Sequence, residues 1–410
     1  MYVEALQCKE CGERYPLAAS FACESCFGPL GVTYDHSDLD SAEARRRIQA
    51  GPPTLWRYSD FLPFERRPQT ALAAGVTPLV RADRLAERLG LREVWVKNDA
   101  ANPTHSFKDR VVTIAVAKAR ELGYEVVACA STGNLANAVA AHAAAAGLES
   151  YVFIPADLEE QKVLATGVYG TTLVAVRGNY DDVNRLCTEL SGERDWAFVN
   201  VNLRPYYSEG SKTVGFEIAE QLGFELPGRV VCPIASGSLF SQIARGLEEW
   251  IELGIVAGEL PVFSGAQAEG CAPVARAFEA GSRVCRPVKP DTIAKSLAIG
   301  DPADGPYAVE LARRTQGGVT AVSDDEVRDG IRLLAETTGL FTETAGGVTV
   351  ATLARLAERG EIDPGERVVA VVTGEGLKTL DAVRGTFERH VIDPSATEFE
   401  ERVEHAPVAA

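Results

Sequence analysis

A lysine at the start of a predicted helix is the first residue in this sequence that could do nucleophilic chemistry. Lys108 lies in the run Ser106-Phe107-Lys108-Asp109, and the apolar spacing of residues 106–122 predicts a helix. The positive end of a helix dipole disfavours the ammonium form of an amine, which suits a nucleophile that must lose a proton to form an imine. A single lysine at a helix start is more often a solvated surface residue, so other motifs must support this interpretation.

Three further segments carry small or hydroxyl-bearing residues where a strand is expected to end. The run Ser131-Thr132-Gly133-Asn134 offers hydroxyl groups and helix amides that can hold a carboxylate, although the same residue types also cap helices routinely. Residues 235–239 are small enough for backbone N–H groups to approach a phosphate, which taken alone is a weak signal. Thr373 precedes a glycine-rich turn after the last predicted strand.

Four cysteines near the N-terminus have the spacing of a metal site. Cys8 and Cys11 form one C-x-x-C pair, and Cys23 and Cys26 form a second pair after eleven intervening residues. Four thiolates on two such turns match tetrahedral zinc, and a full set of four leaves no open position for catalysis. The sequence therefore predicts a structural zinc ribbon, and the alternative is four free thiols in a module that holds no metal.

The elements that must position these residues alternate between short apolar runs and longer amphipathic stretches. This alternation predicts an α/β protein with parallel sheets covered by helices. In such sheets, ligands bind where strands end and helices begin. Each of the motifs that follow Cys26 in the sequence lies at such a junction. The predicted strands are 94–97, 125–130, 151–154, 172–176, 229–233, 262–267 and 367–372, and the predicted helices are 106–122, 134–146, 158–166, 180–193, 239–253 and 325–337.

Taken together and in this order, the motifs resemble those of the tryptophan-synthase-β-like (fold type II) pyridoxal-phosphate (PLP) enzymes, and among these the sequence is similar to the threonine synthases. The resemblance covers about Thr77 to Val383 and includes the N-terminal cysteine block. Its most specific part is the segment 102–110, which reads Asn-Pro-Thr-His-Ser-Phe-Lys-Asp-Arg. Further matches lie at 209–213, 267–270, 292–294, 299–302 and 376–378.

The resemblance implies a role for each of the residues singled out above. Lys108 would carry PLP as an imine and act as the catalytic base, with Phe107 beside it. Thr373 would face the pyridine nitrogen, and because a neutral hydroxyl stabilises a pyridinium less than a carboxylate does, the ring would be a weaker electron sink. Asn134 would bind the ring hydroxyl of the cofactor. The substrate carboxylate would be bound by Ser131, Thr132 and Gly133. The phosphate of the cofactor would be bound by Ala235, Ser236, Gly237, Ser238 and Leu239.

The reaction implied by the resemblance is the conversion of O-phosphohomoserine and water into L-threonine and phosphate. PLP would assist elimination of the γ-phosphate, and water would then add at Cβ, with Lys108 moving the protons in turn. The fold implied is a fold type II PLP enzyme with two α/β domains and a small N-terminal zinc ribbon. The expected ranges are 1–33 for the ribbon, 34–111 and 201–391 for the large PLP-binding domain, 112–200 for the small domain and 392–410 for a tail.

Two positions depart from the pattern of the threonine synthases and bear on the substrate. Tyr207 stands where many of them have a phosphate-binding arginine, and Arg204, three residues upstream, is the candidate replacement. His105 replaces a small residue and is a candidate substrate contact or a packing variant. These departures favour an alternative: a related β-replacement enzyme such as cysteate synthase, acting on O-phosphoserine. A second alternative is a non-catalytic binding protein on a PLP scaffold, and an intact Lys108, Asn134 and Thr373 argue against it.

Composition limits the partners and the location. The formal net charge of −17 argues against a broad nucleic-acid or anionic-membrane surface. No apolar run approaches the roughly 20 residues that span a bilayer, and the polar N-terminus shows no signal peptide. An odd number of cysteines, nine, argues against a disulfide framework. We therefore expect a cytoplasmic protein whose partner is a small phosphorylated amino acid, and the resemblance implies a homodimer.

Overall fold

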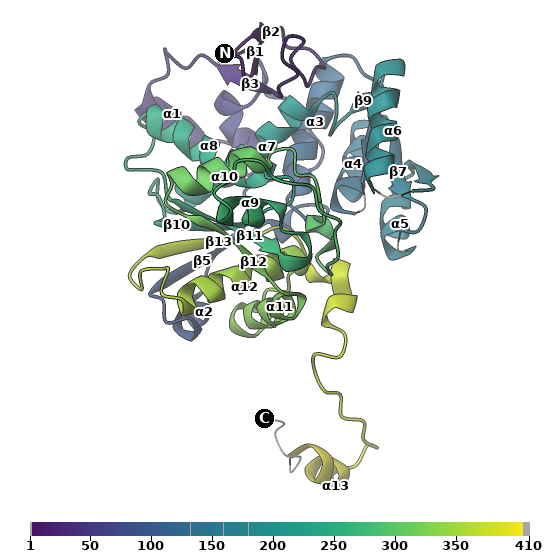
Figure 1. Ribbon diagram of the computed structural model, residues 1–410, viewed down its shortest axis with the longest axis vertical. Coiled ribbons are helices and arrows are strands. Elements are labelled where there is room, and N and C mark those ends of the chain that lie inside the picture. Colours follow the sequence, from purple (N-terminus) through teal and green to yellow (C-terminus); the bar gives the residue numbers. More distant parts are fainter. Residues whose placement is uncertain (1, 132, 159, 179, 405–410) are drawn as a thin grey trace.

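Two parallel-rich sheets with helices on their faces form the body of the protein (Figure 1), so the predicted α/β architecture is confirmed. The computed structural model describes residues 2–404 except 132, 159 and 179. The larger sheet has six strands. All pairs of adjacent strands are parallel except β4 and β5, which are antiparallel. From one edge to the other they are β12 (Gly318–Val322), β11 (Val262–Ala268), β10 (Arg229–Pro233), β13 (Arg367–Val372), β5 (Glu93–Asn98) and β4 (Leu79–Arg81).

The second sheet has four parallel strands and lies to the right of the first in Figure 1. Their order is β8 (Thr172–Val176), β7 (Glu149–Pro155), β6 (Val126–Ala130) and β9 (Ala197–Phe198). Helix α3 (Lys108–Glu121) contacts both α4 (Asn134–Ala146) of this part and α7 (Arg204–Gln221) of the other. The domain ranges expected from the sequence stay a prediction.

The remaining helices cover these sheets and connect their strands. None of the helices in the described ranges is both long and apolar enough to cross a membrane. They are α1 (Ser41–Gln49), α2 (Asp83–Arg88), α5 (Glu160–Gly167), α6 (Tyr180–Glu193), α8 (Ser238–Glu252), α9 (Pro273–Glu279), α10 (Gly305–Arg314), α11 (Asp324–Thr338), α12 (Thr344–Glu358), α13 (Ala396–Phe399), and the short turns η1 (Leu55–Phe61), η2 (Asp99–Ala101), η3 (Glu269–Cys271), η4 (Lys295–Leu297), η5 (Gly376–Val383) and η6 (Glu400–Glu404).

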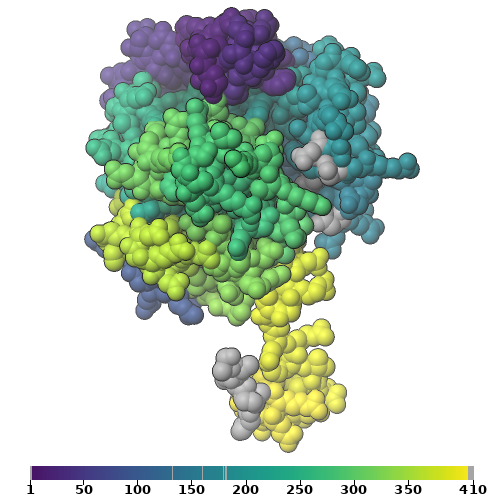
Figure 2. All heavy atoms as spheres, viewed as in Figure 1, coloured from purple at the N-terminus to yellow at the C-terminus, as the bar shows by residue number. Residues whose placement is uncertain are grey.

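The N-terminal block is a small antiparallel sheet at the top of the molecule in Figure 1. Its strands, in spatial order, are β2 (Arg14–Tyr15), β1 (Val3–Cys8) and β3 (Leu30–Tyr34). At the other end of the chain, the segment after η5 leaves the body and carries α13 away from it, and the space-filling view shows this tail as a separate projection (Figure 2).

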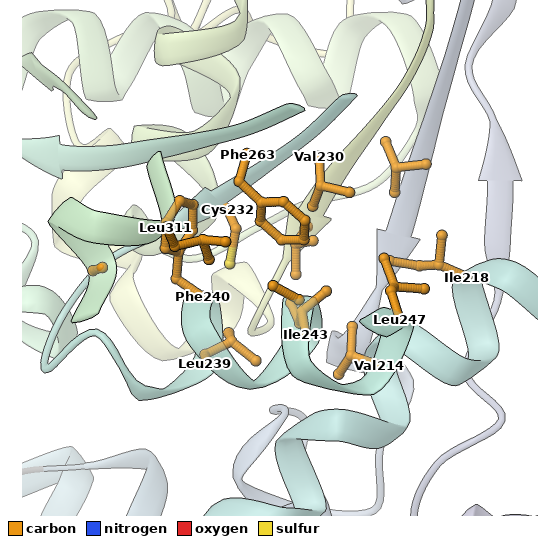
Figure 3. Close-up of a cluster of buried hydrophobic side chains, with 14 of the residues drawn as sticks. Val214, Ile218, Val230, Cys232, Leu239, Phe240, Ile243, Leu247, Phe263 and Leu311 are labelled. Carbon is orange, nitrogen blue, oxygen red and sulfur yellow. The ribbon is translucent and has the colours of Figure 1, made fainter. Parts of the chain in front are cut away.

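The largest apolar cluster fixes α8 against the larger sheet. Phe240, Ile243 and Leu247 of α8 are fully buried and pack with Val230 of β10 and Phe263 of β11 (Figure 3). These side chains recur every three or four residues, so they share one face of the helix. The packing holds the N-terminus of α8 at the end of β10, where the sequence predicts a phosphate-binding loop.

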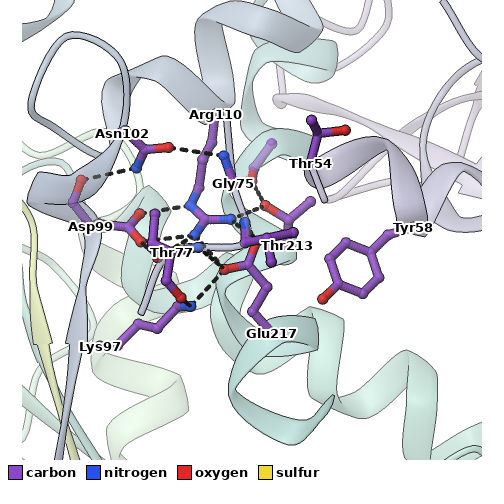
Figure 4. A network of polar contacts seen from close by, with 12 residues as sticks. Thr54, Tyr58, Gly75, Thr77, Lys97, Asp99, Asn102, Arg110, Thr213 and Glu217 are labelled. Carbon is purple, nitrogen blue, oxygen red and sulfur yellow. Dashed lines mark hydrogen bonds and ion pairs between the residues drawn. The ribbon is translucent and has the colours of Figure 1, made fainter. Parts of the chain in front are cut away.

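A buried ionic network fixes the N-terminus of α3. Arg110 donates to both carboxylate oxygens of Asp99 (2.7 and 2.8 Å) and to both of Glu217 (2.5 and 2.7 Å), as Figure 4 shows. Lys97 of β5 adds a second cation at 2.6 Å from Glu217. All four side chains are fully buried, so each charge depends on its partners for compensation. The network ties the first turn of α3, and with it Lys108, to β5 and α7.

Candidate active site

Most of the predicted site segments follow parallel strands that lie beside one another. Thr373 follows β13, the 235–239 loop follows β10, and η2 follows β5 and leads towards Lys108. Because these three strands are neighbours and parallel, their carboxyl ends lie at one edge of the sheet. Two of the segments are joined directly by backbone contacts. Ser106 forms a β-bridge with Gly374, and Phe107 N donates a 2.9 Å hydrogen bond to the Thr373 carbonyl.

Lys108 is the first residue of α3, two residues later than the sequence-predicted start. Its Nζ donates a 3.0 Å hydrogen bond to the hydroxyl of Tyr207, on α7. The same Nζ lies 4.6 Å from the ring centroid of Phe107 and 5.6 Å from that of Tyr207. The amine thus lies close to two aromatic rings. The hydroxyl contact was not anticipated, because nothing in the sequence links positions 108 and 207.

Asn134 and Thr373 meet at a carboxylate that the sequence reading did not single out. Glu343 is 2% exposed and accepts from Asn134 Nδ2 at 3.1 and 2.9 Å. The Thr373 hydroxyl donates to the same group at 3.4 Å. Burial raises the pKa of the Glu343 carboxyl, while Asn134, Lys378, Thr373 and Lys108 act in the opposite direction. The sequence feature that could have pointed to Glu343 is its place as an isolated acid in Thr342-Glu343-Thr344, directly before a run of small and apolar residues.

The predicted phosphate loop has the geometry that a backbone anion site requires. Gly237 has a φ of +98° and caps α8, and a Cβ atom on it would lie 2.6 Å from the Asp304 carbonyl oxygen. Asp304 N donates to the Ser236 carbonyl at 2.8 Å, which fixes the loop from outside. The first amides of an α-helix have no carbonyl partner within the helix, which makes the N-terminus of α8 suited to an anion, although Ser238 N has a long contact of 3.4 Å with Ser236 Oγ. Ala235, Ser238 and Leu239 complete the segment.

The residues predicted to bind the substrate differ in their positions and contacts. The Ser131 hydroxyl accepts from Gly133 N at 3.1 Å and from Ala136 N at 3.0 Å, so it caps α4. Thr132 lies outside the described residues. Arg204 begins α7 and forms a 2.7 Å ion pair with Asp304, beside the phosphate loop. His105 is exposed and has a φ of +61°.

Residues around Lys108 and Glu343 fit a cofactor with polar edges. Among the described residues, Ser106 Oγ and Thr344 Oγ1 are buried and have no hydrogen-bond partner, and each belongs to a residue within or next to one of the site segments. A buried polar atom without a partner is costly, so a group that supplies the missing contacts would relieve it. With a lysine amine, an amide, a hydroxyl and a backbone anion loop near one sheet edge, the donor set matches PLP.

The four predicted metal ligands come together in the N-terminal block. The Sγ atoms of Cys8, Cys11, Cys23 and Cys26 all lie within 4.8 Å of one another. Cys8 and Cys23 are buried, while Cys11 and Cys26 are exposed. Four thiols at this spacing are compatible with the tetrahedral zinc sites of zinc ribbons.

Comparisons with known proteins agree with this fold. The family described as pyridoxal-phosphate dependent enzyme matches residues 70–374. Threonine synthase from Methanocaldococcus jannaschii is 37% identical over 380 residues, 92% of this chain and 93% of that protein. Threonine synthase from Methanosarcina acetivorans is 37% identical over 94% of this chain and 95% of that protein. Among solved structures, threonine deaminase isoform 2 from Solanum lycopersicum has a TM-score of 0.64 at 21% identity, covering 90% of this chain and 91% of that one.

These findings define the class first: the architecture is that of the fold type II PLP-dependent enzymes, as the sequence predicted. The similarity to the curated relatives extends over more than nine-tenths of the chain. The chain belongs to the threonine synthase family of these enzymes.

Proposed function

We propose that this protein is a threonine synthase, which converts O-phosphohomoserine and water into L-threonine and phosphate with PLP as its cofactor. The observation that carries the proposal is 37% identity to threonine synthases over more than nine-tenths of the chain. The position of Lys108 beside the ends of β5 and β13 supports it.

Lys108 is the residue we propose as the catalytic base and the covalent anchor of the cofactor. PLP, when bound, withdraws electrons from the substrate carbons. Lys108 then moves a proton at Cα and afterwards at Cβ, and water adds at Cβ after phosphate leaves from Cγ. The Tyr207 hydroxyl, 3.0 Å from the amine, orients it, and Phe107 limits its freedom from the other side.

The remaining site residues have binding roles in the proposal. Asn134 would hold the ring hydroxyl of the cofactor, Thr373 the ring nitrogen, and residues 235–239 its phosphate. Ser131, Thr132 and Gly133 would hold the substrate carboxylate at the N-terminus of α4. Arg204 would reach the substrate phosphate, for which it must share or leave its ion pair with Asp304. His105, on the exposed side, would lie at the entrance.

Three broader properties complete the proposal. The four cysteine Sγ atoms, mutually within 4.8 Å, support a structural zinc ion. Reduced cysteines and the net charge of −17 support a cytoplasmic enzyme with no nucleic-acid or membrane partner. A homodimer is proposed from the resemblance to the family.

The experiment that tests the function is an assay of phosphate and threonine with purified protein, PLP and O-phosphohomoserine. Equal amounts of both products are expected. The Lys108→Ala variant should lose the visible absorption band of the bound cofactor and turnover, because the amine proposed to bind the cofactor covalently is then missing. If a protein with that band releases no phosphate, the substrate assignment is wrong, and sulfite with O-phosphoserine is the next pair to test.

A further inference from the structure

Asp109, the residue after Lys108, closes the short loop that carries the lysine. Its carboxylate accepts from Thr104 N at 2.8 Å and from the Thr104 hydroxyl at 2.9 and 3.0 Å. Asp109 is fully buried, and Thr104 is 4% exposed. This segment, residues 104–109, is called the lysine loop below. Its two ends are joined by these contacts, so the path of the chain through Lys108 is fixed from both sides.

A histidine from another helix contacts the same carboxylate. His142 Nε2 lies 2.9 Å from Asp109 Oδ1, and Thr113 Oγ1 lies 3.5 Å from the other ring nitrogen of His142. His142 is 4% exposed. Because a carboxylate can only accept hydrogen bonds, the ring nitrogen that faces Asp109 must carry a proton. Asp109 therefore joins the lysine loop to α4 through one defined donor.

Helix α4 is connected to the lysine loop at a second point. Lys378 Nζ, on η5, donates to the Thr104 carbonyl at 2.6 Å and to Asn134 Oδ1 at 2.9 Å. Asn134 is the first residue of α4, and His142 follows about two turns later on the same helix. The two ends of the lysine loop are thus both tied to α4, through Lys378 at Thr104 and through His142 at Asp109.

The same helix begins with the turn that we propose for the substrate carboxylate. The Ser131 hydroxyl accepts from Gly133 N and Ala136 N, which fixes that turn to the first residues of α4. Removal of the proton at Cα requires the amine of Lys108 to reach the carbon that bears this carboxylate. The position of α4 relative to the lysine loop sets that approach, and a displacement of about 1 Å can cost on the order of 100-fold in rate.

We propose that His142 is a positioning residue, which through Asp109 keeps the carboxylate-binding turn of α4 aligned with Lys108. This inference deepens the proposed function and rests on it. His142 touches neither the substrate nor the cofactor, and it acts only through its contact with Asp109. Such a role predicts an effect on the proton-transfer step, whereas a purely structural role predicts a loss of stability and no change in that step.

Two amide substitutions of different length separate these roles. In His142→Gln the amide nitrogen can take the place of Nε2 and donate to Asp109, whereas the shorter side chain of His142→Asn cannot reach it. We expect His142→Asn to lower kcat about 10- to 100-fold with little change in KM, because the carboxylate site itself is intact. The kinetic isotope effect of a substrate deuterated at Cα should rise in this variant, since proton removal becomes slower. His142→Gln should recover most of the wild-type kcat.

His36→Asn is the matched control. It removes a 2.9 Å contact between a histidine ring and the Asp60 carbonyl, outside the site, and should keep the wild-type kcat and isotope effect. Equal losses of kcat in His142→Gln and His142→Asn would overturn the proposal. A His142→Asn protein of lower melting temperature but wild-type kcat and isotope effect would overturn it as well.

If His142→Asn does not fold, ¹⁵N NMR of the histidine rings in the wild-type protein gives a second test that needs no turnover. The signals of His142 are assigned by their absence from the spectrum of His142→Gln. A proton on Nε2 supports the proposal, and a ring that carries its proton on Nδ1 alone overturns it. If the wild-type protein shows no cofactor band and releases no phosphate from O-phosphohomoserine, it is the proposed function that fails, and these two measurements show it separately.

Discussion

At Lys108, one hydroxyl group and two aromatic rings determine where the amine can point. The Tyr207 hydroxyl accepts from Nζ at 3.0 Å, and the rings of Phe107 and Tyr207 flank it. A tyrosine at position 207 therefore has a physical explanation in this protein, although the resemblance leads us to expect an arginine there. In the proposed function, Tyr207 orients the base, and Arg204 is the candidate for the contact with the substrate phosphate.

Replacing Tyr207 with phenylalanine tests this contact at the level of one atom. The ring remains and the hydroxyl is lost, so the amine loses the acceptor of its 3.0 Å hydrogen bond. A hydrogen bond to a charged group contributes about 1.5–3 kcal/mol, which corresponds to a loss of kcat of roughly 10- to 150-fold. The measurement is kcat and KM for phosphate release. Tyr151→Phe, which removes an exposed hydroxyl bonded to Glu149, should behave as wild type.

Gly237 is the second position where a single added atom would change the geometry of the site. A Cβ atom there would lie 2.6 Å from the Asp304 carbonyl oxygen, and the φ of +98° is strained for any other residue. We expect Gly237→Ala to weaken PLP binding at least ten-fold and to lower stability by about 1–3 kcal/mol. Gly254→Ala, at the other end of α8, adds a methyl group at φ +66° in open space and should leave PLP affinity unchanged. Equal PLP affinity in both variants would contradict the steric argument.

At the scale of the elements, the position of α3, which begins with Lys108, depends on a buried ionic network. Arg110 is two residues from Lys108, and its partners Asp99 and Glu217 belong to η2 and α7. Burial alone would raise the pKa of Glu217, but Arg110 and Lys97 outweigh it and lower that pKa to about 2. Such a network gives α3 a fixed position relative to the sheet edge.

The network predicts a specific acid sensitivity. Because the pKa of Glu217 is lower in the folded than in the unfolded chain, its stabilising contribution is complete above about pH 4.5 and is lost as the pH falls towards about 2. Glu217→Gln should remove this pH dependence and destabilise the fold by about 3–5 kcal/mol at neutral pH, since it leaves buried cations uncompensated.

Denaturant unfolding at pH 7 and between pH 4.5 and 2 measures both effects. Glu225→Gln breaks an exposed ion pair with Arg367 and is the matched control. It should cost less than about 1 kcal/mol. A Glu217 variant as stable as this control would show that the buried network does not contribute as argued.

At the scale of the whole molecule, the N-terminal block rests on the helix that carries Arg204 and Tyr207. Tyr34 donates to Glu209 of α7 at 2.6 Å, and Tyr206 of α7 donates back to the Ala18 carbonyl at 3.0 Å. Tyr307 of α10 donates to Glu10, between the first two cysteines. The cysteine cluster therefore holds together a surface that supports α7 and α10.

The metal prediction follows from this arrangement. We expect about one zinc ion per chain, and metal binding that organises such a ribbon contributes on the order of 10 kcal/mol to its folding. Cys23→Ser should therefore lose the zinc and lower the melting temperature. Metal analysis together with thermal unfolding checks this, and Cys285→Ser, outside the cluster, should retain the zinc. A wild-type protein purified without chelators that contains no zinc would refute the proposal.

The sequence alone was sufficient for the class of fold and for the cysteine cluster. Alternating apolar and amphipathic stretches are local patterns, and β13 begins and ends where they predict. The four cysteines lie close in sequence, so their convergence required only two turns. The motif around Lys108 is specific enough that the family followed from it.

Only the tertiary structure showed which side chains meet. Helix α12 was absent from the prediction because its small, apolar residues lack an amphipathic pattern, and Glu343 was overlooked with it. The partners Lys108 and Tyr207, or Asn134 and Glu343, are separated by 99 and 209 residues. Periodicity reports the local path of the backbone, whereas contacts across such separations depend on how complete elements pack, and no local pattern records that.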